Sequence, residues 1–244
     1  GQHDQSINLY REVLQVTPDD PEALESLARI LSRAGRHRES LPIYQGLAAR
    51  NPSNPTYPME IARAHLRLGD EAAAHQVLIS ILNADPQNRE ARLQVARMEI
   101  GRGNRDTALR HFEILLQQDP RDSTALLGKA QIAYYQGDHR TAHENATAVV
   151  VNEPNNFDAV FLLANIERAR RHRRATRDLL DRAEQISPNN SEVRAMQERL
   201  RQEPVITIRT SASYARELGA PTQFVLKDAV PASVRPIFEE VLGS

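Results

Sequence analysis

The sequence predicts an all-α protein, a right-handed solenoid of paired helices with a short non-repeat C-terminal extension. Prolines recur every 34 residues, at Pro18, Pro52, Pro86, Pro120, Pro154 and Pro188. Glycines keep the same interval, at Gly1, Gly35, Gly69, Gly103 and Gly137. Two files of small residues do so as well, one from Ala28 to Ala164 and one from Ser6 to Thr176. A fixed period of this length is the signature of a repeat array.

Each 34-residue repeat is predicted to hold two helices. The proline ends the second helix, because it has no backbone N–H and cannot continue a helix. The glycine turns the chain between the two helices, where positive φ is expected. The small residues let the paired helices approach closely. Two positions after each proline, an Asp or Asn is placed to cap the next helix: Asp20, Asn54, Asn88, Asp122, Asn156 and Asn190.

The period divides the chain into a repeat array, a cap and an extension. The array covers residues 1–190, as a half repeat 1–20 and full repeats 21–54, 55–88, 89–122, 123–156 and 157–190. Residues 191–203 are predicted to be a polar capping helix, with Val193, Met196 and Leu200 on one face. The extension, residues 204–244, alternates with strand period from Ile206 to Tyr214 and then predicts a short helix.

The first residues match the second half of a repeat. Because Gly1 holds the mid-repeat glycine position, we expect the chain to be part of a longer protein. Its opening helix is then expected to turn Ile7, Tyr10 and Leu14 toward an upstream neighbour. The alternative is a true terminus that is capped by a half repeat.

Composition narrows the possible functions. The 244 residues have a net charge of −1, which argues against a dedicated nucleic-acid binder with a broad cationic face. There is no cysteine, so disulfides and thiolate zinc sites are excluded. No run of about 18 apolar residues occurs, so no transmembrane segment is predicted.

The repeat resembles the tetratricopeptide repeat over residues 1–190. The segments ALESLARILSRAGRHRESLPIYQGLAARNPSN and ARLQVARMEIGRGNRDTALRHFEILLQQDPRD carry the pattern best. The unbroken interval of 34 disfavours the nearest rival, a 35-residue RNA-reading repeat. The chain departs from the family at two aromatic positions of the first helix. Leu24, Pro58, Arg92, Leu126 and Val160 stand in the Trp place, and Leu31, His65, Glu99, Ala133 and Glu167 in the Tyr place.

The resemblance implies a concave groove that is lined by the first helix of each repeat and binds a partner segment. Its N-terminal half would carry a basic ladder of Arg29, Arg33, Arg63, Arg67 and Arg97. Further along, an apolar strip would consist of Met59, Leu66, Leu93, Ile100, Leu127, Tyr134, Tyr135 and Phe161, with Gln131 and Asn165 as amide donors. The implied partner is a protein or peptide with acidic groups and apolar anchors. The Lys and Asn set of the chaperone-tail carboxylate clamp is missing. The alternative is that the arginines only solvate the surface and some apolar members belong to the core.

A second basic feature, the arginine turn, is the segment RARRHRRATR over residues 168–177. Arg171 stands where the other repeats have glycine, so the segment is interpreted as a solvated turn between two helices. The alternative is an anion-binding patch for headgroups, nucleic acid or an acidic segment. That patch would consist of Arg168, Arg170, Arg171, Arg173, Arg174 and Arg177.

No catalytic motif stands out, and we expect neither an enzyme nor a cofactor. His139 and His143 are four residues apart on one helix face, a spacing that can bind zinc, but no third ligand is evident nearby. A metal site is therefore not predicted.

The sequence favours a non-catalytic scaffold for protein–protein interaction. An alternative function follows from the strand-like segment after the array. In this respect the chain resembles bacterial exopolysaccharide exporters of the type that serves cellulose synthase, in which a periplasmic array contacts synthase partners or polymer. The two functions correspond to cytoplasm and periplasm, and the sequence decides neither this nor the oligomeric state.

Overall fold

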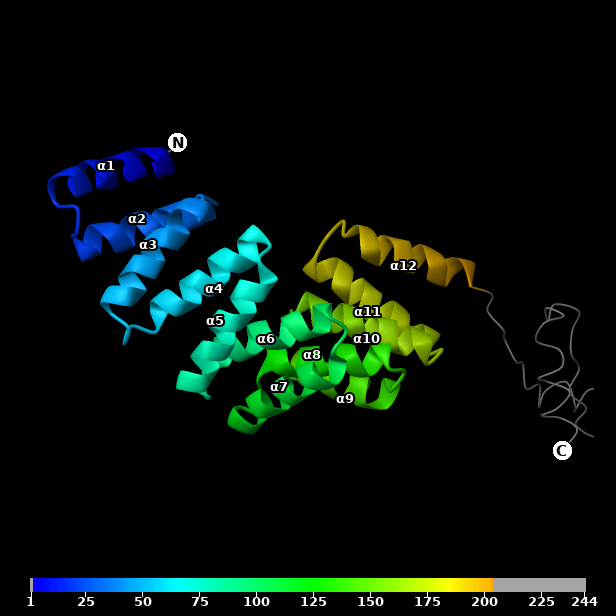
Figure 1. Cartoon of the computed structure of the whole chain (residues 1–244). Coiled ribbons are helices and arrows are strands. Elements are labelled where there is room, and N and C mark those ends of the chain that lie inside the picture. Colours follow the sequence, from blue (N-terminus) through cyan, green and yellow to red (C-terminus); the bar gives the residue numbers. More distant parts are fainter. Residues whose placement is uncertain (1, 204–244) are drawn as a thin grey trace, which may run out of the picture. The chain divides into compact units, whose positions relative to one another are not determined.

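A computed structural model describes residues 2–203, which form twelve α-helices and no strand (Figure 1). The chain divides into two compact units, Gly1–Asn189 and Asn190–Ser244. The predicted strand and short helix of residues 204–244 lie outside the described residues. The helices of the first unit are α1 (Gln2–Val16), α2 (Pro21–Arg33), α3 (His37–Arg50), α4 (Thr56–Leu68), α5 (Glu71–Ala84), α6 (Arg89–Gly101), α7 (Arg105–Gln118), α8 (Ser123–Tyr135), α9 (His139–Asn152), α10 (Phe157–Ala169) and α11 (Arg173–Ile186). The second unit contains α12 (Ser191–Gln202), within the segment expected to cap the array.

In the first unit, each helix packs against the helices before and after it in the sequence. The helices α2 to α11 form five pairs, one in each 34-residue interval. The predicted all-α repeat array is therefore confirmed. None of the described helices combines the length and the apolar character that a membrane span requires.

The Asp and Asn file caps the first helix of each pair. The Asp20 side chain accepts hydrogen bonds from the backbone N–H groups of Glu22 and Ala23, at 2.9 and 3.1 Å. Asn88, Asp122, Asn156 and Asn190 cap their helices in the same way, and the Asn54 side chain accepts from Thr56. The caps satisfy backbone donors that a helix leaves free at its start.

The mid-repeat turns need a left-handed residue. Gly35, Gly69, Gly103 and Gly137 have φ between 76° and 82°. In the last repeat, Arg171 takes the same place with φ 63°. The predicted turn is thus retained without its glycine, although left-handed backbone is unfavourable for an arginine.

The core lies between the paired helices and follows the two small-residue files. The five alanines of the first file, from Ala28 to Ala164, are fully buried, as are the residues of the second file from Ser40 to Thr176. Gly128 on α8 serves the same purpose, because the ring of Phe112 from α7 occupies the space that a Cβ would need. Close approach of the helices therefore depends on the absence of bulk at these positions.

The expectation for the opening helix is wrong. Ile7 is fully buried, and Tyr10 and Leu14 pack with it against Leu27 and Leu31 of α2. The exposed apolar side chains of α1 are instead Leu9, Val13 and Val16, at 60%, 39% and 83% exposure. The apolar pattern of this helix has two sides, and the prediction chose the side that packs on the next helix.

Candidate functional site

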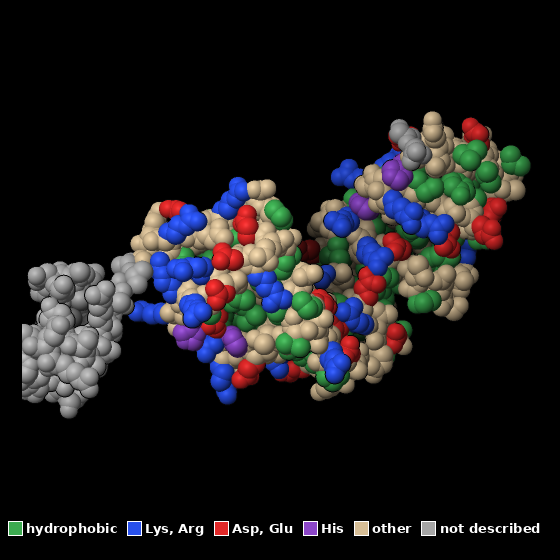
Figure 2. Space-filling model, turned by 180° about the vertical axis from the view of Figure 1, so that it is seen from behind, with side chains coloured by type: hydrophobic (Ala, Val, Ile, Leu, Met, Phe, Trp, Pro, Cys, Tyr) green, Lys and Arg blue, Asp and Glu red, His purple; other side chains and the backbone are tan. Residues whose placement is uncertain are grey.

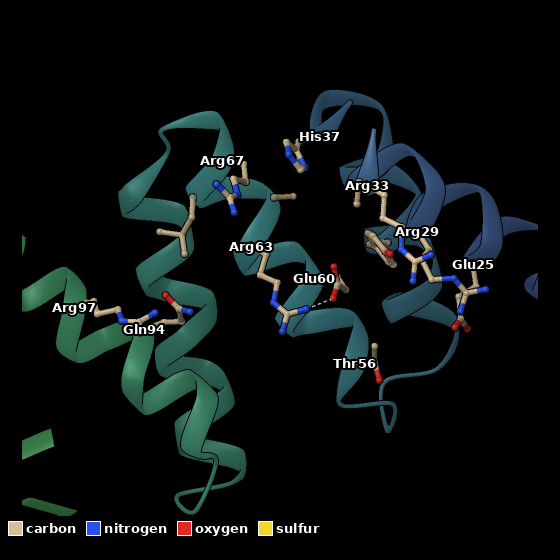
Figure 3. A pocket seen from close by; sticks show the side chains of 14 residues that line it. Glu25, Arg29, Arg33, His37, Thr56, Glu60, Arg63, Arg67, Gln94 and Arg97 are labelled. Carbon is tan, nitrogen blue, oxygen red and sulfur yellow. Dashed lines mark hydrogen bonds and ion pairs between the residues drawn. The ribbon is translucent and has the colours of Figure 1, made fainter. Parts of the chain in front are cut away.

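A groove of about 700 Å³ lies between the first helices of three successive repeats, α2, α4 and α6 (Figure 3). All five arginines of the basic ladder line it. The second-helix residues His37 and Tyr44 of α3 also contribute to its wall. The remaining lining residues are Glu25, Ser32, Thr56, Glu60, Ala64, Leu66 and Gln94.

The 34-residue period explains why the arginines gather on one side. Arg29, Arg63 and Arg97 each follow an alanine of the first small-residue file, and that alanine faces the core. Arg33 and Arg67 follow one helical turn later, so they point in the same direction as Arg29 and Arg63. All five arginines are exposed.

The ladder arginines differ in their partners. The Arg63 guanidinium forms ion pairs with Glu60 on its own helix and with Glu90 at the start of α6. The hydrogen bond to Glu90 raises the pKa of Arg63 above its ordinary value. Arg29 donates to the Ser26 hydroxyl at 3.3 Å.

Arg33, Arg67 and Arg97 are the ladder members that make no side-chain hydrogen bond or ion pair within residues 2–203. Figure 3 shows Arg33, His37 and Arg67 near the mid-repeat turns, whereas Arg63 points to Glu60. The positive charge that is open to a ligand is therefore concentrated on three of the five arginines.

Two buried tyrosines support the groove near α2. The Tyr57 hydroxyl donates to Glu25 Oε2 at 3.0 Å and so holds that carboxylate against α4. Tyr44 packs 6.4 Å from Tyr57 between ring centroids, and burial raises the pKa of its hydroxyl. Both side chains are fixed, so the wall of the groove needs little ordering when a ligand binds.

The predicted apolar strip is only partly accessible. Met59 and Leu93 are buried in two core clusters at 7% and 6% exposure, so they do not line a surface groove. Leu66, Ile100, Leu127 and Tyr134 are half-buried and pack against core clusters. Burial depends on the neighbouring helix, and spacing alone does not show it.

The accessible part of the strip lies on α8 and α10. Tyr135 is 73% exposed and Gln131 is also exposed. Phe161 is half-buried and stacks on Phe157, with ring centroids 5.6 Å apart. The Asn165 side chain donates to the Phe161 carbonyl at 2.9 Å, so it already has a partner for its amide group.

Two buried glutamates, Glu99 and Glu167, organise the mid-repeat turns and were not predicted to do so. Glu99 accepts hydrogen bonds from Arg102 and Asn104 at 3.0 and 2.8 Å, and His75 of α5 lies 3.5 Å away. The hydrogen bond from Asn104 lowers the pKa of Glu99, against the opposing effect of burial. These contacts join the mid-repeat turn to the preceding helix pair.

Glu167 repeats this arrangement two repeats later. Its carboxylate contacts Arg170 at 2.9 Å, His172 at 2.6 Å and His143 of α9 at 3.3 Å. The signal in the sequence is an acidic residue where the family often has tyrosine. Its partners could not be named from the sequence, because they come from another repeat and from the turn.

The arginine turn spans the end of α10, the turn itself and the start of α11. Arg170 pairs with Glu167, and Arg168 and Arg173 have interactions of their own. Arg171, Arg174 and Arg177 are exposed. The structure thus separates the six arginines into a group engaged by the fold and a group open to solvent.

The histidine pair does not gain a third ligand. The His139 ring lies against Tyr134, with centroids 5.7 Å apart, whereas His143 contacts Glu167. In the part of the chain that the structure describes, no group of three or more His, Cys, Asp or Glu residues could hold a metal ion.

Two helices per 34 residues, a glycine turn and a groove along the first helices define a helical repeat protein with a binding surface. Tetratricopeptide repeat models match residues 1–57, 32–98, 93–134 and 127–191. The chain belongs to the tetratricopeptide repeat family.

Solved structures share this fold at low sequence identity. YrrB, described as a tetratricopeptide repeat protein with an unusual peptide-binding site, is 15% identical, with a TM-score of 0.58 over 78% of this chain and 97% of its own. A tetratricopeptide repeat protein from Parabacteroides merdae is 21% identical, with a TM-score of 0.59 over 82% and 78%. The type IV pilus biogenesis factor PilW is 16% identical, with a TM-score of 0.64 over 75% and 84%. No curated protein sequence matches the chain.

Proposed function

We propose that the chain is a non-catalytic scaffold whose groove binds an acidic segment of a partner protein. The tetratricopeptide fold is consistent with protein or peptide binding. The observation that carries the proposal is the set of three groove arginines, Arg33, Arg67 and Arg97, without an acidic partner in the described residues.

The chemistry of arginine favours a carboxylate ligand. A guanidinium presents several N–H donors in a planar fork that matches a carboxylate. The three arginines stand on α2, α4 and α6, so a single bound segment would run across three repeats. Because packed helices hold these side chains on a fixed surface, ordering of the partner is the main entropic cost of binding.

The partner is proposed to carry apolar anchors next to its acidic residues. Leu66 lies within the groove, and the exposed ring of Tyr135 lies on α8, beyond α6 in the array. A solvent-exposed aromatic side chain is a common anchor in protein interfaces. YrrB, which shares the fold, is described as having a peptide-binding site, and this supports the choice of a peptide over other ligands.

The test is a selection of random peptides by display on the wild-type chain. We expect the selected peptides to be enriched in Asp and Glu. Arg67→Glu and Arg97→Glu are each expected to weaken a selected peptide at least about tenfold, since each removes charge-assisted hydrogen bonds and adds repulsion. Fluorescence anisotropy with a labelled peptide measures the loss.

Arg38→Glu is the matched control, because Arg38 is an exposed arginine on α3 that does not line the groove. It makes the same charge change and should leave the affinity unchanged. Selected peptides without acidic enrichment, or equal losses in the control and the groove variants, would contradict the proposal.

The exporter alternative remains a separate proposal. It rests on the alternating segment Ile206 to Tyr214, which lies outside the described residues, so the geometry of the groove does not bear on it. The sequence of the parent gene tests it. A run of alternating strands downstream and a signal peptide upstream would support it, and their absence would remove it.

A further inference from the structure

The arginine turn departs from the other repeats in a way that weakens the fold. Four mid-repeat turns place glycine in the left-handed region, and Arg171 adopts φ 63° at the equivalent position. A side chain with a Cβ is disfavoured there, whereas glycine is not. The position therefore holds an exposed positive charge at the expense of backbone strain, and such strain commonly accompanies function.

The charges at this turn are arranged outward. Arg171, Arg174 and Arg177 are spaced three residues apart, and none makes a side-chain hydrogen bond or ion pair with the described residues. Glu167, the buried carboxylate at the turn, is already occupied by Arg170, His172 and His143. The buried acid therefore does not neutralise the three exposed arginines.

Helix α9 adds a fourth basic residue beside the turn. His143 contacts Glu167, which brings the start of α9 against the turn between α10 and α11. Arg140 lies three residues before His143 on the same helix, hence on the same face, and is exposed. Arg140 and Arg174 also hold equivalent positions one repeat apart, so their side chains leave the array in the same direction.

We propose that Arg140, Arg171, Arg174 and Arg177 form a cationic tip that docks on an anionic lipid surface. A protruding turn can meet a flat layer of headgroups with all four guanidinium groups, which bind phosphate well. The segment of residues 168–177 has no aromatic residue on which bases could stack, so single-stranded nucleic acid fits less well.

The surface of the rest of the chain also disfavours a long polyanion. Figure 2 shows acidic and basic side chains intermixed over the visible face. The net charge of the chain is −1. Contact that is confined to one tip avoids repulsion of these acidic groups, whereas a duplex lying along the array would meet them.

The experiment measures co-sedimentation of the full chain with vesicles at low salt. We expect binding to vesicles of phosphatidylcholine with about one third phosphatidylglycerol, and none to phosphatidylcholine alone. Each of Arg174→Gln and Arg177→Gln should weaken the binding about fivefold. Raising the salt to about 0.5 M should abolish it, because the contact is between exposed charges.

Arg171→Gly separates the binding role from a structural role. It should weaken vesicle binding about fivefold and at the same time raise the thermal midpoint by about 2 °C, since glycine relieves the strain. A variant that merely unfolds cannot give this pair of results. Arg38→Gln, an exposed arginine on α3, is the matched charge control and should bind as the wild type does.

Three results would overturn the proposal. One is equal binding to neutral and anionic vesicles, or none to either. Another is unchanged vesicle binding in Arg171→Gly, which would leave the charge at this turn without a role. The third is tighter binding to a DNA duplex than to anionic vesicles at the same salt, which would assign the tip to nucleic acid instead.

Discussion

The Arg89 guanidinium on α6 holds the Asp122 carboxylate at the start of α8 in a two-point ion pair. Arg89 Nε lies 2.6 Å from Asp122 Oδ2, and Arg89 Nη2 lies 3.0 Å from Oδ1. The same carboxylate caps α8 by accepting from the backbone N–H groups of Thr124 and Ala125. One buried acid thus fixes both the beginning of a helix and the joint between two repeats.

Arg89→Ala is expected to lower the free energy of unfolding by about 1–3 kcal/mol, because a buried carboxylate loses its charged partner. Asp122 is almost fully buried, so water compensates poorly. Urea unfolding followed by circular dichroism measures the change. Arg50→Ala is the control. Its ion pair with Asp19 is exposed on both sides and should contribute less than about 1 kcal/mol. Equal losses in the two variants would contradict this account.

The same ion pair should make stability depend on acid pH. Burial raises the pKa of Asp122, but the hydrogen bonds from Arg89 and from the backbone N–H groups of its cap outweigh it, so the net pKa is lowered. A lowered pKa in the folded state means that the unfolded chain binds more protons. Stability from Asp122 is therefore present above about pH 4 and is lost as the pH falls through the folded pKa.

Asp122→Asn isolates this effect, since asparagine also caps helices but does not titrate. We expect wild type and variant to differ most in urea midpoint near neutral pH and to converge in acid, below the ordinary pKa of an aspartate. A difference that stays constant over this whole range would show that Asp122 has an ordinary pKa.

Arg92→Leu is expected to stabilise the protein, by about 1 kcal/mol, because an unpaired buried charge is costly. Arg92 is a buried arginine that donates to the Pro86 carbonyl and lies 3.4 Å from His111, with no carboxylate beside it. The equivalent positions of other repeats hold Leu24, Leu126 and Val160. A lower melting temperature in the variant would contradict this reasoning.

The Arg92 substitution also has a signature at His111. Burial lowers the pKa of His111, and the positive charge of Arg92 lowers it further. Wild-type stability should therefore fall as the pH drops below about 6.5, because the unfolded histidine takes up a proton more readily. In Arg92→Leu, an NMR titration of His111 should give a higher pKa. An unchanged value would mean that burial alone controls this histidine.

Gly128→Ala tests the close packing of α7 and α8. A Cβ at this position would lie 2.3–2.7 Å from three ring atoms of Phe112, so we expect a loss of about 1–3 kcal/mol. Gly46 on α3 has nothing within 4 Å of the corresponding point and is exposed. Gly46→Ala should therefore stabilise by about 0.5–1 kcal/mol through higher helix propensity. Thermal unfolding of both variants should show shifts of opposite sign.

Much of the fold was predictable because its signals are local. A proline that ends a helix, the Asp20 cap and the turn at Gly35 each depend on a few neighbouring residues. Their 34-residue spacing was enough to predict the helix pairs. Even the turn at Arg171 was predicted without its glycine, since the flanking repeats fixed its place.

The candidate site was only partly predictable because its contacts join separate repeats. The period placed the five arginines on one side, but it could not show that Arg63 is occupied by Glu60 and Glu90. Met59 has the spacing of a groove residue, and only the facing helix determines that it is buried. The partners of Glu99 come from the preceding pair and the following turn, which a single-helix pattern does not include.

The contacts of Glu99 and Glu167 recur after two repeats and not after one. Joining residue 88 directly to residue 157 would therefore set His75 opposite Glu167, a pairing equivalent to the one it has with Glu99. Joining residue 88 to residue 123 would instead set His75 opposite Ala133, which cannot accept its proton. Shortened or lengthened versions of this array should therefore tolerate module exchange in even steps better than in odd ones.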